Sequence, residues 1–522
     1  MLPFNLPLFS ETDFISYVVN NDSSGYNISG VSKEDFSNYC KEFEKRGLVK
    51  KEGFETTLHS YAAYSFDGTG VFVNFYENLK EININIENSC NYFNFKDITL
   101  EKTVTPQITQ VELDDFGMSY AVRLSDGRFI IFDGGWDFEP DVNNLLKTLK
   151  ENSPYEKPVV AAWFLTHPDC DHFHCFVGML DRFAGEVEIE KVLFNFPEAD
   201  DKRYTDRLTS VVRRLEGYGS DGDYINRMKA HIEKYKIPTF MPHAGQVYRI
   251  GDSVCEILSS IDDTIYGYNG INCMSLVVRM QLGGQVILWT ADSECDSSRI
   301  LWRYGDYLKA DIMQIAHHGF SSDADNSQID TYKVINPSVC LLPVSEYNAY
   351  TAIDSFIESS KFVFTKLGVD EVITGTPQRT ITLPYTAPQY AKKELENSYL
   401  SGLDNNGSRT WIFTGLNTAN KEDFIYTVLN TGRTTEVLIE MFFEHSSDRI
   451  GCIKTELPVQ TIRTICITDK KDVVTDYKFF NWEELDKKGV PENSPFAVRF
   501  MANAPIVVSN KNHTATYFSP NR

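Results

Sequence analysis

Four potential metal ligands fall within six consecutive residues in the first half of the chain. The window THPDCDH (166–172) directly follows the apolar run PVVAAWFL (158–165), which is typical of a buried strand. A tight loop after a strand end would let side chains at 167, 169, 171 and 172 converge on one point, whereas a helix would splay them around its axis. Imidazoles and carboxylates together suit zinc, manganese or iron. The window therefore predicts a metal site at the end of a strand.

Two later strands are expected to end in further ligands. The run GGQVILWTAD places Asp292 after a second apolar strand, and ADIMQIAHHG places His317 and His318 after a third. Folds of the α/β class hold their sites at the carboxyl ends of strands. Alternation of such strands with helical segments, including one expected at 139–151, predicts a layered α/β domain around this centre.

The other parts of the chain differ in pattern from this central part. A length of 522 residues favours about two to four domains. Residues 1–105 combine a helix expected at 33–50, with Ser32 as its N-cap, and alternating runs typical of strands, which predicts a small α+β segment. An α/β domain that contains these ligand candidates is expected at 106–385, a linker at 386–408, and a β-sandwich in the strand-rich stretch 409–522.

Charge and composition exclude several classes of partner. The formal net charge is -23, from 50 basic and 73 acidic residues, and such a shell repels long nucleic acids and anionic membranes. No run of about 18 apolar residues occurs, so no spanning helix is expected. The start lacks a secretory pattern, and the ten cysteines include no CxxC pair. We therefore expect a cytoplasmic protein with reduced thiols.

The motifs together resemble those of the metallo-β-lactamase-fold hydrolase superfamily. The matching runs are FDGG (132–135), HPDCDH (167–172), TAD (290–292) and HHG (317–319), in the order of that superfamily. The usual HxHxDH pattern here reads HxDxDH, because Asp169 replaces the second histidine, and this variant is similar to competence-protein-type and phosphodiesterase-type members. The resemblance covers about 107–385 and implies an αββα sandwich.

This resemblance also implies a ligand set. Two divalent ions, zinc or manganese, would be held by His167 and Asp169 on one side, by Asp171, His172 and His318 on the other, and by Asp292 between them. A single ion is the alternative, because a middle histidine of the family is missing where 270–275 offers only Asn272 or Cys273 as substitutes. Asp171 and His317 are expected to act in catalysis, with His317 beside the ligands or as proton donor to the leaving group. Either histidine of the pair 317–318 remains an alternative ligand.

Further residues are expected around the centre. Asp133 would orient the ligands through hydrogen bonds. His174 is interpreted as a packing residue, with substrate contact as the alternative. The insert at 198–236 reads as a solvated helical hairpin or as a lid whose Arg213 and Arg214 meet an anionic substrate.

The implied activity is hydrolysis by a metal-activated hydroxide, with a small phosphodiester or a related ester as substrate. The C-terminal region contains the runs TEVLIEMFFE (435–444) and VPENSPFAVRFMANAPIVVS (490–509). With these runs it resembles the β-sandwich of sensory-rhodopsin-transducer-like proteins, which implies a binding or assembly module and a homo-oligomer formed through it. The alternative function is a non-catalytic metal-binding sensor or scaffold with a ligand-binding β-sandwich.

Overall fold

The chain divides into two compact units, Met1–Ser345 with Ala352–Ala387, and Glu346–Thr351 with Pro388–Arg522. Each is described here by itself. The computed structural model describes residues 14–20, 23–88, 90–98, 100–114, 117–201, 220–261, 271–293, 301, 304–319, 327–345, 369–376, 378–388, 408–417, 419–430, 435–443, 449–457, 462–466, 475–478 and 495–510. No helix in this described part is long and apolar enough to cross a membrane.

The first unit begins with an antiparallel sheet of six strands in the order β1-β2-β6-β5-β4-β3. Helix α1 (Lys33–Lys45) starts at the predicted N-cap, because Ser32 and Asp35 form a reciprocal capping box. It buries Phe36, Tyr39 and Phe43 against this sheet. The strands are β1 (Phe14–Asn20), β2 (Ser23–Ser29), β3 (Val49–Glu55), β4 (His59–Phe66), β5 (Thr69–Tyr76) and β6 (Glu81–Glu87).

This sheet is joined to the central part of the unit by buried polar and aromatic contacts. His59 lies between Tyr307 and Asn74, with nitrogen–oxygen distances of 2.9 Å to each. Asn74 also donates to the carbonyl of Gly245 at 3.2 Å. Phe72 belongs to the same core cluster as residues of the central sheets. The N-terminal segment and the central domain therefore share a core.

The first central sheet has the order β13-β12-β10-β9-β8-β7-β21, and β11 pairs with β10. Strands β9, β10, β12 and β13 are parallel, whereas β7, β8 and β21 are antiparallel additions. The bounds are β7 (Gln107–Gln110), β8 (Ser119–Arg123), β9 (Phe129–Asp133), β10 (Val159–Phe164), β11 (Glu188–Ile189), β12 (Val192–Leu193), β13 (Thr239–Phe240) and β21 (Arg379–Thr382).

The second central sheet follows in the order β14 to β20, with parallel pairing from β17 onward. Its strands are β14 (Val247–Ile250), β15 (Ser253–Ser259), β16 (Val277–Leu282), β17 (Gln285–Trp289), β18 (Ile312–Gln314), β19 (Val339–Ser345) and β20 (Glu371–Thr376). Parallel strands β9, β10, β17 and β18 end next to the motif residues. Both sheets therefore deliver polar side chains at their carboxyl ends.

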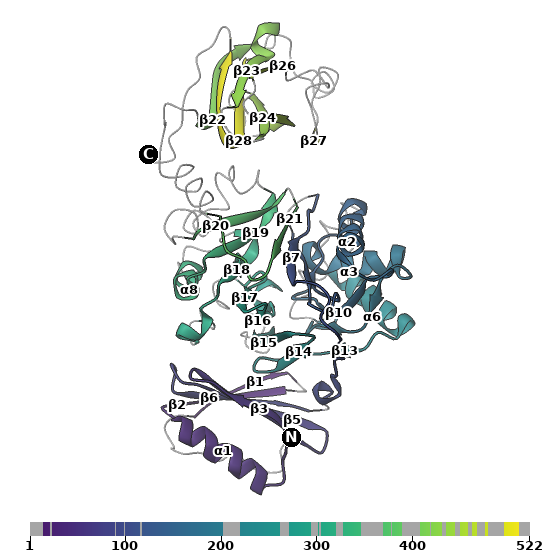
Figure 1. Ribbon diagram of the computed structural model, residues 1–522, viewed down its shortest axis with the longest axis vertical. Coiled ribbons are helices and arrows are strands. Elements are labelled where there is room, and N and C mark those ends of the chain that lie inside the picture. Colours follow the sequence, from purple (N-terminus) through teal and green to yellow (C-terminus); the bar gives the residue numbers. More distant parts are fainter. Residues whose placement is uncertain are drawn as a thin grey trace. The chain divides into compact units, whose positions relative to one another are not determined.

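Alternating side chains of β9 show how the layers form. Ile130 and Phe132 point into the core between the two sheets, whereas Phe129 and Ile131 pack against helices. Phe132 stacks on Trp289 of the second sheet with a ring-centroid distance of 4.4 Å. Helices α2 (Glu139–Asn152), α3 (Cys170–Phe183) and α6 (Asp221–Tyr235) cover the first sheet, and α8 (Ser327–Ile335) lies beside the second (Figure 1). The predicted mixed α/β fold class is confirmed.

The second unit is built from strands alone apart from one short 3-10 turn, η6 (Lys421–Phe424), in its described part. Seven strands form one antiparallel sheet in the order β26-β23-β28-β24-β25-β27, and β22 also pairs with β28. The long strand β28 pairs with β22 and β24 in its first half and with β23 in its second, around a core that includes Trp411, Tyr426 and Phe500. The strands are β22 (Ser408–Asn417), β23 (Ile425–Asn430), β24 (Thr435–Phe443), β25 (Arg449–Leu457), β26 (Ile462–Cys466), β27 (Thr475–Lys478) and β28 (Pro495–Asn510).

Candidate metal centre

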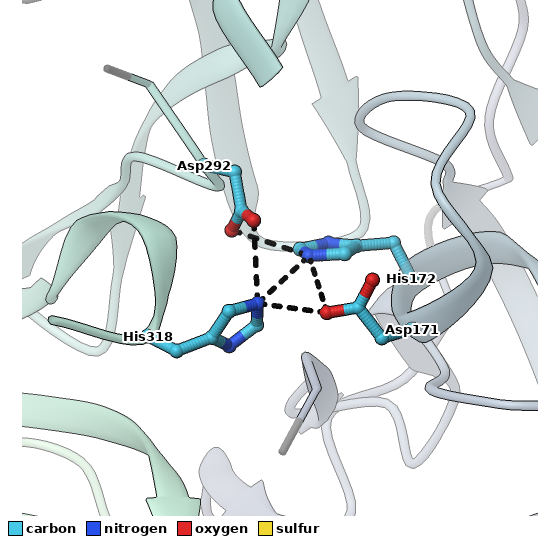
Figure 2. A group of neighbouring side chains, drawn as sticks. All are labelled: Asp171, His172, Asp292 and His318. Atoms are coloured by element: carbon cyan, nitrogen blue, oxygen red, sulfur yellow. Dashed lines mark hydrogen bonds and ion pairs between the residues drawn. The ribbon is translucent and has the colours of Figure 1, made fainter. Parts of the chain in front are cut away.

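Four buried side chains meet between the two central sheets: Asp171, His172, Asp292 and His318 (Figure 2). The structure thus brings together four of the six predicted ligands, and their ligand atoms all lie within 4.8 Å of one another. His172 Nε2 lies 3.2 Å from both His318 Nε2 and Asp292 Oδ1. His318 Nε2 lies 2.9 Å from Asp171 Oδ2 and 3.2 Å from Asp292 Oδ2.

Asp171 and His172 come from the first turn of α3, which corrects the expectation of a loop throughout the window. Of the four ligand candidates in this window, His167 and Asp169 precede the helix, and Asp169 is its N-cap. The helix starts this early because a carboxylate cap accepts from the free amides of the first turn, where acidic side chains are also favoured. Asp171 and His172 still converge, since Asp292 and His318 approach from the facing sheet (Figure 2).

The second sheet presents its two ligands from strained turns. Ala291, His317 and His318 all adopt positive φ angles, of 49°, 47° and 52°. Residues other than glycine rarely adopt this conformation, and it persists where the surrounding structure holds it. The strain therefore lies in the two turns that carry Asp292 and His318.

Each ligand histidine is oriented through its other ring nitrogen. His172 Nδ1 donates to Asp133 Oδ2 at 2.7 Å, and His318 Nδ1 donates to the carbonyl oxygen of Pro343 at 3.1 Å. Both rings therefore direct Nε2 into the group, as metal-binding histidines commonly do. Asp133 also accepts from the backbone amide of Thr166 at 2.7 Å and from its hydroxyl at 2.6 Å, which fixes the carboxylate.

The spacing and chemistry of the donors fit a divalent ion. Four ligands placed 2.0–2.1 Å from zinc in a tetrahedron lie about 3.3 Å from one another. The distances between neighbouring donor atoms of the group range from 2.9 to 3.6 Å. Two imidazoles and two carboxylates suit zinc or manganese.

Electrostatics in the group couple the histidines to the carboxylates. Burial lowers the pKa of His318, but the charges of Asp292 and Asp171 outweigh it and raise this pKa to about 9. Burial also lowers the pKa of His172, and the neighbouring carboxylates again leave it well above its usual value. For Asp292 burial raises the pKa, yet the two imidazoles hold it well below its usual range. Protons thus occupy the histidines when no other cation is bound.

His167 lies at the edge of the group as a neutral imidazole. Burial, followed by the charge of His172, lowers its pKa to about 4. Its Nδ1 lies 3.1 Å from the Thr166 hydroxyl, which itself donates to Asp133, so Nδ1 carries the hydrogen. Nε2 lies 3.9 Å from Asp292 Oδ2 and has no hydrogen-bond partner among the described residues. A buried ring nitrogen without a hydrogen-bond partner in the described chain therefore lies close to the carboxylate of Asp292.

Asp169 caps α3 with one of its carboxylate oxygens. Its Oδ1 accepts from the Cys170 amide at 2.8 Å. Within the described residues, it forms a donor group with Cys170 and Asp171, and no group of three donors joins it to His167. The ligand pair expected for a further ion stays a prediction.

The two histidines of the HHG run differ in position. His318 belongs to the four-ligand group, and only 1% of its side chain is exposed. The His317 side chain is 19% exposed, and its Nε2 lies 3.9 Å from Asp292 Oδ2. Asn272 Nδ2 donates to this Nε2 at 3.2 Å, so Asn272 contacts His317. Cys273 is buried beside it and joins no donor group in the described chain.

His174 lies one turn beyond Asp171 on α3 and points away from the four-ligand group, toward α6. Its Nε2 is 3.1 Å from Asp221 Oδ1, and its ring stacks on Tyr224 with a centroid distance of 3.5 Å. It therefore ties α6 to α3. Arg213 and Arg214 lie outside the described residues.

Several contacts at the centre were absent from the sequence prediction. The carbonyl of Pro343 and the hydroxyl of Thr166 orient ligand histidines. Thr166 is adjacent to His167 in the motif, so its contact with the His167 ring could have been predicted from the sequence. Nothing in the sequence marks a backbone carbonyl 25 residues beyond His318 as its partner.

Comparisons with known proteins found similar solved structures. A metallo hydrolase from the archaeon Ignicoccus hospitalis is 11% identical with a TM-score of 0.31, covering 54% of this chain and 100% of that chain. A flavodiiron protein from Giardia intestinalis is 10% identical with a TM-score of 0.24, covering 57% of this chain and 60% of that one. The Anabaena sensory rhodopsin transducer is 17% identical with a TM-score of 0.15, and the match covers 20% of this chain and 83% of that chain. No family model and no curated protein matches the sequence.

Proton release should accompany ion binding. The pKa of about 9 keeps His318 protonated at pH 7 in the ion-free protein, and the raised pKa of His172 favours its protonated form as well. An ion needs both Nε2 atoms deprotonated, so we expect about two protons released per Zn²⁺ at pH 7 and tighter binding as the pH rises toward 9. Calorimetry in phosphate and in Tris buffer measures this number. Release should fall by about one proton in His318→Gln and stay unchanged in His231→Gln, and binding without proton release would contradict the assignment.

Proposed function

We propose that this chain is a metal-dependent hydrolase acting on a small phosphodiester or a related ester. The observation that carries the proposal is the buried group Asp171, His172, Asp292 and His318, in which both imidazoles are oriented from behind by hydrogen bonds. Such burial of two carboxylates is costly unless cations compensate them. An ion-binding function explains why the group is assembled at all.

The residues divide into binding and orienting roles. The group of four would hold the ion, zinc or manganese, and Asp133 would keep His172 directed toward it. An ion bound there supplies Lewis acidity and activates water at neutral pH. His167, whose Nε2 lies 3.9 Å from Asp292 Oδ2, would take part in holding a second ion together with Asp169.

His317 is the proposed proton donor to the leaving group. It is the partly exposed histidine at the centre, so a substrate can reach it. Because Asn272 donates to Nε2, the ring carries its hydrogen on Nδ1 in the neutral form. A positioned imidazole of this kind contributes roughly 10²–10⁴-fold to such reactions.

A small anionic or neutral ester fits the charge of the chain better than a polynucleotide. The net charge of -23 repels long phosphate backbones, and this repulsion grows with each added phosphate. The HxDxDH variant resembles phosphodiesterase-type members, which favours a phosphodiester within the ester class. Contact of Arg213 and Arg214 with the substrate and assembly of copies through the second unit stay predictions.

One observation favours a second candidate, a non-catalytic metal-binding sensor or scaffold. Asp169 caps α3 through Oδ1, and among the described residues no group of three close donors contains both Asp169 and His167, so these residues hold one complete ligand set and only part of another. Two-metal hydrolysis uses both ions to stabilise the attacking and leaving oxygens. A sensor would bind an ion and show no turnover.

Ion content and turnover separate the two candidates. We expect the purified chain to contain at least one zinc or manganese ion by mass spectrometry and to hydrolyse bis-p-nitrophenyl phosphate or a p-nitrophenyl ester. Asp292→Asn should lower kcat/KM about 100-fold or more, because one shared ligand loses its charge. Asp181→Asn, a surface control paired with Arg227 and His231, should retain full turnover. A metal-loaded chain inactive on both phosphodiesters and carboxylic esters supports the sensor instead.

The adjacent histidines should give different results on substitution. His318→Gln should lose bound metal, because Nε2 of His318 is part of the ligand group. His317→Gln should keep the metal and lower kcat roughly 100-fold, since it removes only the proposed proton donor. Metal content and kcat measured on both variants check this. Loss of metal in His317→Gln with retention in His318→Gln would reverse the assignment.

A further inference from the structure

One buried amide lies between the two turns that carry Asp292 and His318. Gln314 is the last residue of β18 and is fully buried. Its Oε1 accepts from the backbone amide of Thr290 at 2.9 Å and lies 3.2 Å from the Thr290 hydroxyl. Its Nε2 donates to the carbonyl oxygens of Ala291 at 3.1 Å and of Ile315 at 2.6 Å. Nε2 therefore donates two hydrogen bonds, and Oε1 accepts one from the Thr290 amide.

These partners belong to both ligand-bearing turns. Thr290 and Ala291 directly precede Asp292, and Ile315 lies three residues before His318. The carbonyl of Ala291 also accepts from the backbone amide of His317 at 3.0 Å. The Thr290 hydroxyl donates to the carbonyl of Gln314 at 2.7 Å. One side chain thus ties the end of β17 to the end of β18.

The tied residues are also the strained ones. Ala291, His317 and His318 hold positive φ angles. Such conformations persist only where neighbouring contacts over-determine them. Gln314 contacts the carbonyl of Ala291 directly, and that carbonyl anchors His317 in turn. Loss of the amide would leave these turns free to relax toward ordinary backbone angles.

We propose that Gln314 is a positioning residue of the metal centre. It holds Asp292 Oδ2 and His318 Nε2 at the 3.2 Å separation that one ion needs, and it thereby sets the affinity of the centre for that ion. The inference rests on the ion binding of the proposed function and is independent of hydrolysis. Residues that orient ligands in this way typically change metal affinity 10- to 100-fold when they are replaced.

A second buried glutamine in the same unit provides a matched control. Gln246 is also fully buried. Its Oε1 accepts from the His243 amide at 2.9 Å and the Tyr248 hydroxyl at 2.7 Å, and its Nε2 donates to Glu87 at 2.8 Å. None of these partners is a ligand or lies in a ligand-bearing turn. A substitution there removes comparable hydrogen bonds without touching the metal centre.

Zn²⁺ affinity, measured by chelator competition on the ion-free full chain, tests the proposal. We expect Gln314→Met to raise the Kd at least tenfold and Gln246→Met to leave it within about twofold, although both lower the Tm because both leave buried groups unpaired. Unchanged affinity in Gln314→Met, or equal weakening in Gln246→Met, would overturn the positioning role. A wild-type chain that binds no Zn²⁺ would instead remove the proposed function, and the role with it.

Thr290 offers a milder variant if Gln314→Met does not fold. Thr290→Val removes only the hydroxyl that contacts the backbone and side-chain oxygens of Gln314. We expect a several-fold weaker Kd for Zn²⁺ in Thr290→Val and recovery of the wild-type value in Thr290→Ser, which restores the hydroxyl. Wild-type affinity in Thr290→Val, or no recovery in Thr290→Ser, would contradict the tie between the two turns.

Discussion

The attraction between Asp292, which follows β17 of the second central sheet, and His172, in the first turn of α3, is the contact on which the rest of the centre depends. Their atoms lie 3.2 Å apart in a fully buried position. Charged groups are unstable in such surroundings unless opposite charges and hydrogen bonds compensate them. The surrounding elements meet this need by adding His318, Asp171 and Asp133 on every side. The facing sheets are therefore joined by a hydrophobic core in their middle and by charged ligands at their carboxyl ends.

The predictable part of the site follows from strand periodicity and strand ends. Asp292 and His318 follow apolar strands that could be recognised in the sequence, and parallel strands open at one edge of a sheet. The mixed α/β class was predictable for the same reason. Asp133 was predicted as an orienting residue from the FDGG run of the resemblance, and its carboxylate contacts His172.

The remaining features depend on contacts between distant segments. The start of α3 at Cys170 was not predicted, because Asp169 was interpreted as a metal ligand and not as the N-cap of a helix. The partner of His318 is a backbone carbonyl, and backbone carbonyls leave no trace in residue identity. Gln314 could have attracted attention as an amide within the apolar run IMQI, since a buried amide needs partners. Its partners themselves emerge only once β17 and β18 lie side by side.

The two sides of the centre are unequal. One side has four donors already converged, with their outer nitrogens bonded. The other has a neutral His167 whose Nε2 faces Asp292, and an Asp169 engaged at the helix start. The number of ions that the centre binds depends on this second side. The same number distinguishes the proposed two-metal hydrolase from the proposed sensor.

The most direct measurement is a crystal structure of the full chain grown with Zn²⁺, with anomalous diffraction recorded at the zinc edge. We expect an anomalous peak about 2.0–2.2 Å from Nε2 of His172 and of His318 and from carboxylate oxygens of Asp171 and Asp292. Diffraction data that show no peak between these four side chains, with zinc bound elsewhere or absent, would contradict the metal centre.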